Sequence, residues 1–374
     1  MSATRYTGPF MGADETPHRA RLTVGGIAAA VFGLALFVYT VHQTGLGTII
    51  EGIQRVGGWF LAILLLSGFR YLARARAWSL CSEEPHALRI RDTFPAVVSG
   101  DALGNLTPLG LIVSEPTKAA FVRHRVPLMT ALAGIAVENL FYTWSVAVVI
   151  VGGCVALLFS VDVPAPLRVA SLAALGGMVA FMLVTLTMIG GDVRLISRTV
   201  AWLDRRQLCP APLRQRLDKL LAVEAHVYGF RRNHPSRILP VLLLQTAYHA
   251  AGVAEVWLTL QLLVSAVGAR GEVGPEPVSD TASALTQPSL LIAFLLESVN
   301  RLINVVFKFV PLRLGVDEAG TGLLAQALGL TNATGVTLAI VRKARMLVWM
   351  AVGVAFIARR GLAPIEGSRF EARG

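Results

Sequence analysis

The sequence has few of the residues that most directly reveal a catalytic or metal-binding site. Only three of its 374 residues are cysteine, at Cys81, Cys154 and Cys209, and they form no CxxC motif and no paired spacing. Neither a disulfide framework nor a zinc site is therefore predicted. The seven histidines include no HExxH motif, and no GxxxxGK[ST] nucleotide-binding motif occurs. We therefore expect no metal, no nucleotide and no other cofactor.

Charged residues are also scarce, which excludes an ordinary soluble protein. Asp, Glu, Lys and Arg make up 15% of the chain and hydrophobic residues 54%, whereas about 25% of a soluble domain is charged. Residues 22–41 carry no formal charge over the length of a bilayer-spanning helix. Arg19 and Arg21 before them would also suit a cleaved signal peptide, but the apolar run is too long and no small-x-small site follows. The sequence therefore predicts an integral membrane protein with a retained first span.

Further apolar segments predict an all-α fold, a polytopic transmembrane helical bundle of about seven or eight spans. The predicted spans cover residues 22–41, 56–73, 130–159, 167–190, 237–267, 289–310 and 333–358. Two apolar segments between them, 93–125 and 311–330, are interrupted by Pro and Gly. Residues 22–358 are thus treated as one transmembrane domain, with tails at 1–21 and 359–374.

The distribution of Lys and Arg predicts how the chain lies in the cell (inner) membrane. Basic residues gather in the N-terminal tail, after the second span and in the 192–237 loop. The arginines after the second span are Arg70, Arg74, Arg76, Arg89 and Arg91. Basic loops stay in the cytoplasm, so these segments are predicted there, and the 268–288 loop, with one Arg, is predicted outside. The net charge of +11 then reflects cytoplasmic loops rather than nucleic-acid binding.

The C-terminus conflicts with a count of seven crossings. Starting from a cytoplasmic N-terminus, seven crossings would leave Arg359 and Arg360 outside. An eighth crossing within 311–330 would return them to the cytoplasm, and we prefer that arrangement.

The 192–237 loop contains leucines at helical spacing, interleaved with basic residues. The leucines are Leu213, Leu217, Leu220 and Leu221, and the basic residues are Arg214, Arg216 and Lys219. This pattern favours an amphipathic helix that lies on anionic lipid headgroups. A helix that binds a partner protein is the alternative.

The two interrupted segments share a motif. "PLGLIVSE" (108–115) recurs as "PLRLGVDE" (311–318), and Asp101 and Asn105 precede the first Pro at the offsets at which Asn304 and Lys308 precede the second. Matching breaks in two hydrophobic halves indicate an internally repeated transporter whose binding site lies at the broken helices.

Each interrupted segment is predicted to be a re-entrant hairpin that turns at Pro-Leu, because non-helical backbone survives at membrane depth only inside protein or beside water. The first outgoing helix is expected to start at Ser114-Glu115-Pro116, since Ser is a good N-cap and Pro suits the first turn. The second is expected to start between Gly315 and Glu318. A helix N-terminus stabilises nearby carboxylates by about 0.3–1 kcal/mol, so Glu115 and Glu318 are predicted to stay ionised beside a headgroup cavity. The alternative is that each Glu only caps its own helix. The GxxxG at 100–104 would allow close helix packing there.

Charged residues inside the other spans also point to a polar interior. Residues Glu297, Asn300, Arg301, Asn304 and Lys308 share one helical stripe. Each charge at mid-bilayer costs about 2.5–3.5 kcal/mol, so the stripe is predicted to line a substrate cavity. Pairing such as Glu297–Arg301 is the alternative.

Other spans carry charges as well. The third span adds Glu138. The last carries Arg342, Lys343 and Arg345, which could snorkel to the interface. The alternative is that Arg342 and Arg345 neutralise Glu318 or bind phosphate.

These motifs resemble those of the lysylphosphatidylglycerol synthase transmembrane region, also called the flippase-like domain family. The resemblance rests on "GNLTPLGLIVSEPTKAAFVRHRVP" before a span bearing "VEN", and on "PLRLGVDEAGTGLLAQALGL" before "AIVRKARMLVWMAVGV", and it covers about residues 20–360. It implies a helical bundle with two re-entrant segments that moves a lipid headgroup between leaflets. Carried over position by position, it implies roles for Asn105, Pro108, Gly110, Glu115 and Lys118, and for Pro311, Gly315, Glu318, Arg342 and Arg345.

The chain departs from the family pattern in three places. Lys118 and then Arg123 stand where an Arg usually follows the first Glu closely, and Asp317 stands where an Arg usually accompanies the second Glu. With about 16 residues after the last predicted span, no synthase domain is expected.

The leading hypothesis is a carrier that binds a membrane phospholipid or a related amphiphile. An intramembrane lipid-modifying enzyme, with Glu115 or Glu138 as general base, is the first alternative, although no nucleophile or metal set accompanies these carboxylates. A scaffold that acts through the 192–237 loop is the second. No catalytic residue is predicted. The candidate substrate-binding residues are Asn105, Pro108, Gly110, Glu115, Lys118, Glu138, Glu297, Asn300, Arg301, Asn304, Pro311, Gly315, Glu318, Arg342 and Arg345.

Overall fold

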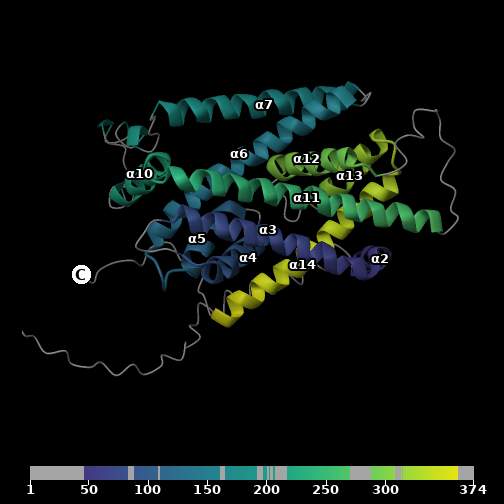
Figure 1. Cartoon of the computed structure of the whole chain (residues 1–374), viewed down its shortest axis with the longest axis horizontal. Helices are drawn as coiled ribbons and strands as arrows, with labels where there is room; N and C mark the ends of the chain where they lie inside the picture. Colours follow the sequence, from purple (N-terminus) through teal and green to yellow (C-terminus); the bar gives the residue numbers. More distant parts are fainter. Residues whose placement is uncertain are drawn as a thin grey trace, which may run out of the picture.

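Every regular element in the described part of the chain is a helix (Figure 1). The computed structural model describes residues 46–82, 88–107, 110–160, 165–191, 197–199, 202, 205–206, 217–269, 288–307, 313 and 315–360. The first half contains α2 (Leu46–Val56), η1 (Gly57–Trp59), α3 (Phe60–Cys81), α4 (Ile90–Leu106), α5 (Gly110–Phe121), α6 (Leu128–Ser160) and α7 (Ala165–Gly190). The second contains α10 (Leu217–Asn233), α11 (Pro235–Ala269), α12 (Leu290–Val306), α13 (Val316–Ala327) and α14 (Asn332–Arg360).

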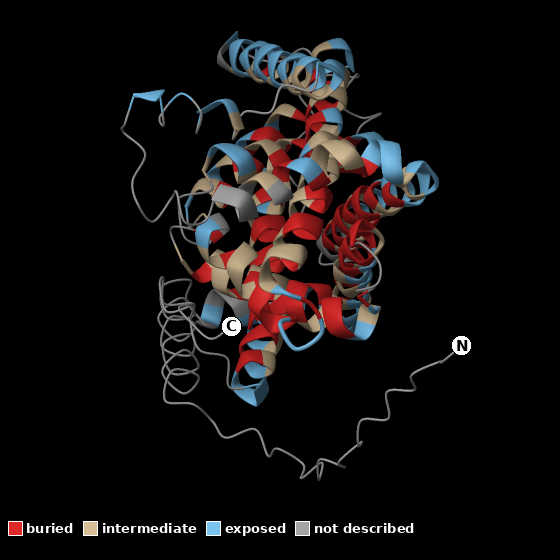
Figure 2. Ribbon diagram, turned by 90° about the vertical axis from the view of Figure 1, so that its left-hand side faces the viewer, coloured by how far each residue is buried: buried red, intermediate tan, exposed pale blue. Residues whose placement is uncertain are grey.

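Three helical stretches in the described residues are long and apolar enough to cross a membrane: Ile53–Cys81, Leu128–Ser160 and Leu167–Gly190. The helices α11 and α14, with 35 and 29 residues, also exceed the length of a span. The helix α7 packs on α6 and exposes most of its other faces (Figure 2), although it is strongly apolar. Such an apolar surface suits lipid rather than water.

Most predicted spans coincide with helices, and two differ in length. Predicted spans 130–159, 167–190, 237–267 and 333–358 match α6, α7, α11 and α14 to within two residues at each end. Instead of ending near residue 73, α3 continues to Cys81, because no Gly or Pro interrupts the chain there. The predicted 289–310 span shortens to α12, which ends at Val306. The 22–41 span and most of the 268–288 loop lie outside the described residues.

The fold consists of two four-helix units with the same plan. We call α3–α6 the first unit and α11–α14 the second unit. In each, a helix of 17 residues (α4 or α12) leads through a break into a helix of 12 residues (α5 or α13), and then into a long helix of 33 or 29 residues (α6 or α14). The two units pack reciprocally: α3 lies against α11, α4 against α14, and α12 against α6. The internal repeat proposed from the two motifs thus extends to helix lengths and packing.

The first hairpin, α4–α5, is held together by close backbone contact. A Cβ at Gly110 would lie 2.7 Å from the carbonyl oxygen of Gly104, and a Cβ at Gly100 would overlap the Lys118 side chain. The GxxxG at 100–104 therefore does pack two helices closely, as predicted. The helix α4 ends at Leu106, and its C-cap Thr107 is extended, because the residue before a proline disfavours the helical conformation.

The predicted start of the helix after the first break, at Ser114-Glu115-Pro116, was wrong. The helix α5 begins at Gly110, four residues before Ser114, and Pro116 lies inside it.

The second hairpin, α12–α13, follows the prediction more closely. The helix α13 starts after Gly315, whose φ of 80° is a conformation that favours glycine. Ile303 of α12 packs against Gly320 of α13, so the two helices lie side by side. At 12 residues, α13 is too short to cross a bilayer alone, so the preferred eighth crossing within 311–330 has no helix of sufficient length.

The two hairpins enter the bundle from opposite ends (Figure 1). The end of the first hairpin lies beside the end of α14, where Arg360 donates a hydrogen bond to the carbonyl of Phe121 at 3.1 Å. The start of the second hairpin lies beside the far part of α11, where Trp257 donates to the carbonyl of Pro288 at 3.1 Å. Because α3 and α11, and likewise α6 and α14, run in opposite directions between these ends, the two units are inverted relative to each other.

The 192–237 loop contains α10, which packs on α6 rather than standing apart. His226 and Phe230 are buried, and the His226 ring nitrogen lies 3.1 Å from the carbonyl oxygen of Cys81. Of the predicted amphipathic leucines, Leu213 lies outside the described residues.

Candidate functional site

The tips of the two hairpins meet at one cavity of about 640 Å³, a size typical of small-molecule sites. Every helix of both units contributes to its lining. From the first unit come Ser67, Arg70, Tyr71, Arg74, Asp101, Gly104, Asn105, Thr107, Gly110, Ser114, Glu115, Lys118, Asn139, Tyr142, Thr143 and Val146. From the second come Tyr248, Asn300, Arg301, Asn304, Val305, Arg313, Asp317, Arg342, Lys343, Arg345 and Met346.

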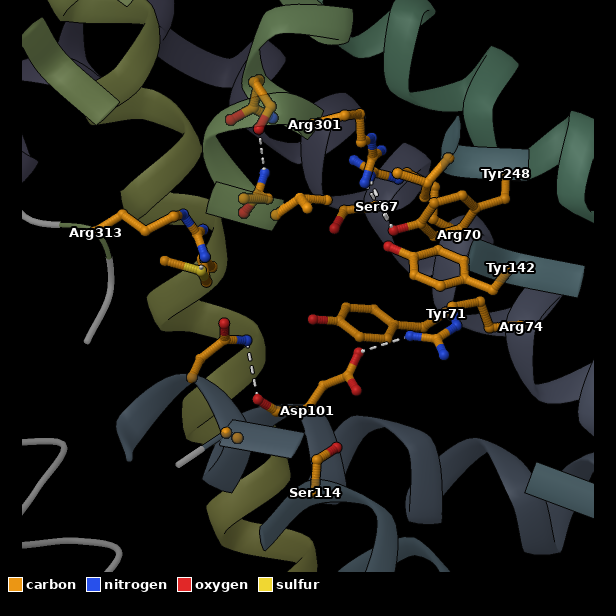
Figure 3. A pocket seen from close by; sticks show the side chains of 18 of the residues that line it. Ser67, Arg70, Tyr71, Arg74, Asp101, Ser114, Tyr142, Tyr248, Arg301 and Arg313 are labelled. Carbon is orange, nitrogen blue, oxygen red and sulfur yellow. Dashed lines mark hydrogen bonds and ion pairs between the residues drawn. The ribbon is translucent and has the colours of Figure 1, made fainter. Parts of the chain in front are cut away.

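Basic side chains dominate this lining. Eight are basic (Arg70, Arg74, Lys118, Arg301, Arg313, Arg342, Lys343 and Arg345), and three are acidic (Asp101, Glu115 and Asp317). Figure 3 looks into the cavity, with Arg70, Arg301 and Tyr248 on one side, Asp101 and Ser114 across from them and Arg313 on a third side. The lining side chains alone thus carry an excess of positive charge, much of which is balanced by glutamates behind the lining.

The first unit holds its charges in a fully connected network. Arg74 on α3 donates two hydrogen bonds to Glu138 on α6, at 3.1 and 3.0 Å, and lies 3.5 Å from Asp101 on α4. Lys118 on α5 bridges Asp101 at 3.0 Å and Glu115 at 3.3 Å. Such a two-pronged Arg–carboxylate contact fixes geometry as well as charge. These ion pairs therefore tie α3, α4, α5 and α6 together.

Two buried glutamates organise the centre of the cavity wall. Glu297 on α12 pairs with Arg301 one turn later and lies 3.8 Å from Arg70 and 3.6 Å from Arg342. Glu255 on α11 pairs with Arg70 at 3.2 Å and also with Arg345. Two carboxylates thus face four arginines, so several guanidinium N–H groups remain available.

Aromatic rings line the wall next to these arginines. The hydroxyl of Tyr248 accepts hydrogen bonds from Arg70 and Arg301, both at 3.2 Å. The guanidinium of Arg70 lies 4.6 Å from the Tyr248 ring centre, and that of Arg74 lies 4.3 Å from the Tyr142 ring centre. These cation–π contacts compensate part of the cost of burying the arginines.

The tip of the second hairpin is less completely paired. Arg313, at φ 50°, is the non-glycine residue with positive φ in the described chain. Its Nε lies 3.7 Å from Asp317, and its Nη2 contacts the sulfur of Met346 at 3.8 Å. Holding a non-glycine residue in this conformation costs free energy and is characteristic of functional sites.

Several polar atoms that line the cavity have no hydrogen-bond partner. They include both terminal nitrogens of Arg342, Nε of Arg313, Oδ1 of Asp317 and Oε2 of Glu115. Leaving such buried groups unsatisfied costs about 1–3 kcal/mol each, more when they are charged. A molecule that offers acceptors to the arginines and donors to the carboxylates would satisfy these groups.

Nine of the predicted site residues line the cavity: Asn105, Gly110, Glu115, Lys118, Asn300, Arg301, Asn304, Arg342 and Arg345. Glu138 and Glu297 lie one layer behind, where they hold lining arginines. Pro108 and Pro311 are outside the described residues. Gly315 and Glu318 are not in the lining.

The role of Glu318 corresponds to the alternative in which it caps its own helix. Its Oε2 accepts a hydrogen bond from the Gly315 backbone at 2.9 Å, and its Oε1 pairs with Lys343. The alternative in which Arg342 and Arg345 neutralise Glu318 was wrong, since Lys343, which lies between them in the sequence, pairs with Glu318 instead.

Sequence reasoning missed Arg70, Arg74, Tyr248 and Arg313. Because hydropathy falls near residue 73, the sequence alone places the two arginines of α3 in a cytoplasmic flank. In the structure α3 continues past this point and buries both arginines. Their spacing of four residues, which puts them on one helix face, was the available signal.

A comparison with protein-family models agrees with this architecture. The model described as "Lysylphosphatidylglycerol synthase TM region" matches residues 25–270. The chain belongs to this family. The match covers the first unit and α11, whereas the second hairpin lies beyond it. No curated protein and no solved structure matches the chain. Membership, together with the apolar helices, makes the chain a membrane protein of a family related to lipid metabolism or lipid flipping.

Proposed function

We propose that the protein is a carrier that moves a membrane lipid between leaflets, with the lipid headgroup in the cavity between the hairpin tips. The observation that carries this proposal is that two inverted hairpins from opposite ends of the bundle meet at one charged cavity. Transporters with inverted repeats bind their substrates at such broken helices near the bilayer midplane.

In this proposal the hairpins are re-entrant and do not cross the membrane. The crossings are then the 22–41 span, α3, α6, α7, α11 and α14. An even number of crossings puts both chain ends on one side. Exposed arginines concentrate at the end of the bundle where α14 finishes, namely Arg89, Arg91, Arg123, Arg125, Arg231, Arg232 and Arg359. By the positive-inside tendency this end is cytoplasmic, which removes the conflict at the C-terminus without an eighth crossing.

In this proposal the lipid tails would leave the cavity between α6 and α12. Thr143 of α6 and Val305 of α12 line it and are exposed at the surface, on two helices that pack together. Ile112 and Val306 beside the hairpin tips expose 69% and 52% of their surface. A headgroup can therefore be held inside while its acyl chains remain in the bilayer. Rocking of one unit against the other would expose the cavity to each leaflet in turn.

The test is lipid translocation in proteoliposomes that contain the full chain. Glu115→Gln removes the charge of a lining carboxylate with one unpaired oxygen, while Arg359→Gln removes one charge from the exposed end of α14. We expect Glu115→Gln to lower the rate at least tenfold and Arg359→Gln to leave it unchanged. A wild-type protein that moves no lipid, or a new lipid species in an overexpressing strain, would contradict the carrier and favour a lipid-modifying enzyme.

A further inference from the structure

We propose that Arg342 and Arg313 form a phosphate-binding pair in the cavity, so that the headgroup is recognised through its phosphate. This inference rests on the proposed function for the source of the phosphate, a phospholipid. It goes beyond that function by naming the group that is recognised and the residues that recognise it.

Arg342 is buried in the cavity wall with unpaired donors. Its side chain is 6% exposed, lines the cavity, and neither Nη1 nor Nη2 makes a hydrogen bond. Its nearest carboxylate is Glu297 at 3.6 Å, which already contacts Arg301 and Arg70. Two parallel N–H groups of one guanidinium match two phosphate oxygens.

The side chain of Arg313 reaches α14 one helical turn from Arg342. Arg313 contacts the sulfur of Met346, which lies one helical turn after Arg342 on α14. The Nε of Arg313 also makes no hydrogen bond, and Asp317 lies 3.7 Å from it, farther than a hydrogen bond reaches. Arg313 thus contacts α14 one turn from Arg342, and both arginines line the same cavity with unpaired N–H donors.

Other cations of the cavity lining are paired with carboxylates. Arg74 and Lys118 are bound by Glu138, Asp101 and Glu115. Arg345 pairs with Glu255 and Lys343 with Glu318. Among the described lining residues, Arg342 and Arg313 retain the most donor capacity without strong charge partners.

The experiment measures lipid retention by the purified full chain with native mass spectrometry. The probes are phosphatidylglycerol and diacylglycerol with the same acyl chains, and inorganic phosphate is added in a separate arm. We expect the wild type to retain phosphatidylglycerol at least tenfold better than diacylglycerol. Arg342→Gln and Arg313→Gln should each reduce that preference at least tenfold, Arg342→Lys should reduce it less, and the surface variant Arg359→Gln should keep it.

The outcomes separate this inference from the proposed function. Thermal unfolding of each variant in detergent identifies any that fails to fold, in which case Arg342→Lys and Arg313→Gln decide. Unchanged lipid preference in folded Arg342→Gln and Arg313→Gln would overturn the phosphate pair while leaving lipid transport intact. Stabilisation by inorganic phosphate that Arg342→Gln removes, with no lipid movement by the wild type, would support the pair and contradict the lipid carrier.

Discussion

The two hairpins have helices of equal length, 17 and 12 residues each, but they hold their charges differently. In the first, Lys118 contacts Asp101 and Glu115. In the second, Asp317 keeps an oxygen without a hydrogen bond, and Arg313 lies in a left-handed conformation beside it. The repeated backbone thus carries a Lys-bridged pair of carboxylates in the first hairpin, where one oxygen of Glu115 stays unpaired, and a less completely paired set of donors and acceptors in the second.

The same contrast holds for the long helices that follow the hairpins. Glu138 is the eleventh residue of α6, and Arg342 is the eleventh residue of α14. Glu138 is bound by Arg74 and also accepts a hydrogen bond from Gln245 at 3.2 Å. The two terminal nitrogens of Arg342 make no hydrogen bond. At this shared position the first unit thus holds a paired carboxylate, and the second holds a guanidinium whose terminal nitrogens are unpaired.

The largest expected effect follows from breaking the network of the first unit. Arg74→Ala leaves Glu138 buried without its arginine partner and removes one of the cations beside Asp101. Removing one partner of a buried ion pair costs about 3–5 kcal/mol, and unfolding of the detergent-solubilised protein should show a loss of that size. Arg76→Ala, two residues along α3 and exposed, is the matched control. Equal stability of the two variants would mean that the network does not hold the unit together.

The next effect tests the reciprocal packing of the two units. A Cβ at Gly353 of α14 would lie 2.7 Å from the Val98 carbonyl of α4, and a Cβ at Gly153 of α6 would overlap Ser298 of α12. Gly353→Val and Gly153→Val should each destabilise the protein by about 1–3 kcal/mol. Gly176→Val on α7, where an added Cβ would meet no atom within 4 Å, should cost far less. A large loss at Gly176 instead would show that glycine content, rather than unit contact, determines stability.

The long helices and the repeat were predictable from sequence because their signals are local. Uncharged runs of about 20 residues predict α6 and α7, and the paired Pro-Leu-x5-Glu motifs predict the two hairpins and their residues at the cavity, such as Glu115 and Asn304. The boundary of α3 was not predictable from hydropathy, because Arg70 and Arg74 lower it as a loop would. Only the tertiary fold reveals that both arginines are matched by Glu255 and Glu138, which come from distant helices.

The motif also could not distinguish Glu115 from Glu318. Both glutamates end the repeated pattern, yet one lines the cavity and the other caps a helix. The difference arises because α5 starts at Gly110, five residues before its Glu, whereas α13 starts at Val316, two residues before its Glu. Helix starts are set by single backbone conformations such as the positive φ of Gly315, which no apolar pattern encodes.

A smaller effect should therefore separate these two glutamates. Glu318→Gln weakens the contact to Lys343, whose side chain is 1% exposed, and should cost about 1–3 kcal/mol of stability, as expected for a hydrogen bond to a charged group. Glu115→Gln should cost less, because Lys118 keeps Asp101 at 3.0 Å. Unfolding measurements on the two variants give the order directly. The reverse order would make Glu115 the structural residue of the pair and Glu318 the candidate for the ligand.

The smallest effect concerns the position at which the hairpins differ most in backbone requirement. Arg313 occupies the place in the motif that Gly110 holds in the first hairpin, and its φ is 50°. A non-glycine residue in the left-handed region costs about 1–2 kcal/mol, and a β-branched residue is least tolerated there. Arg313→Gly should therefore unfold within about 1 kcal/mol of the wild type, because relief of strain offsets the lost contact with Asp317 and the added chain entropy. Arg313→Val, which loses the same contact, should be less stable than Arg313→Gly by about 1–2 kcal/mol. If the two variants unfold alike, the strained backbone at residue 313 is absent in solution, and Arg313 is then not retained at a cost in stability for binding the ligand.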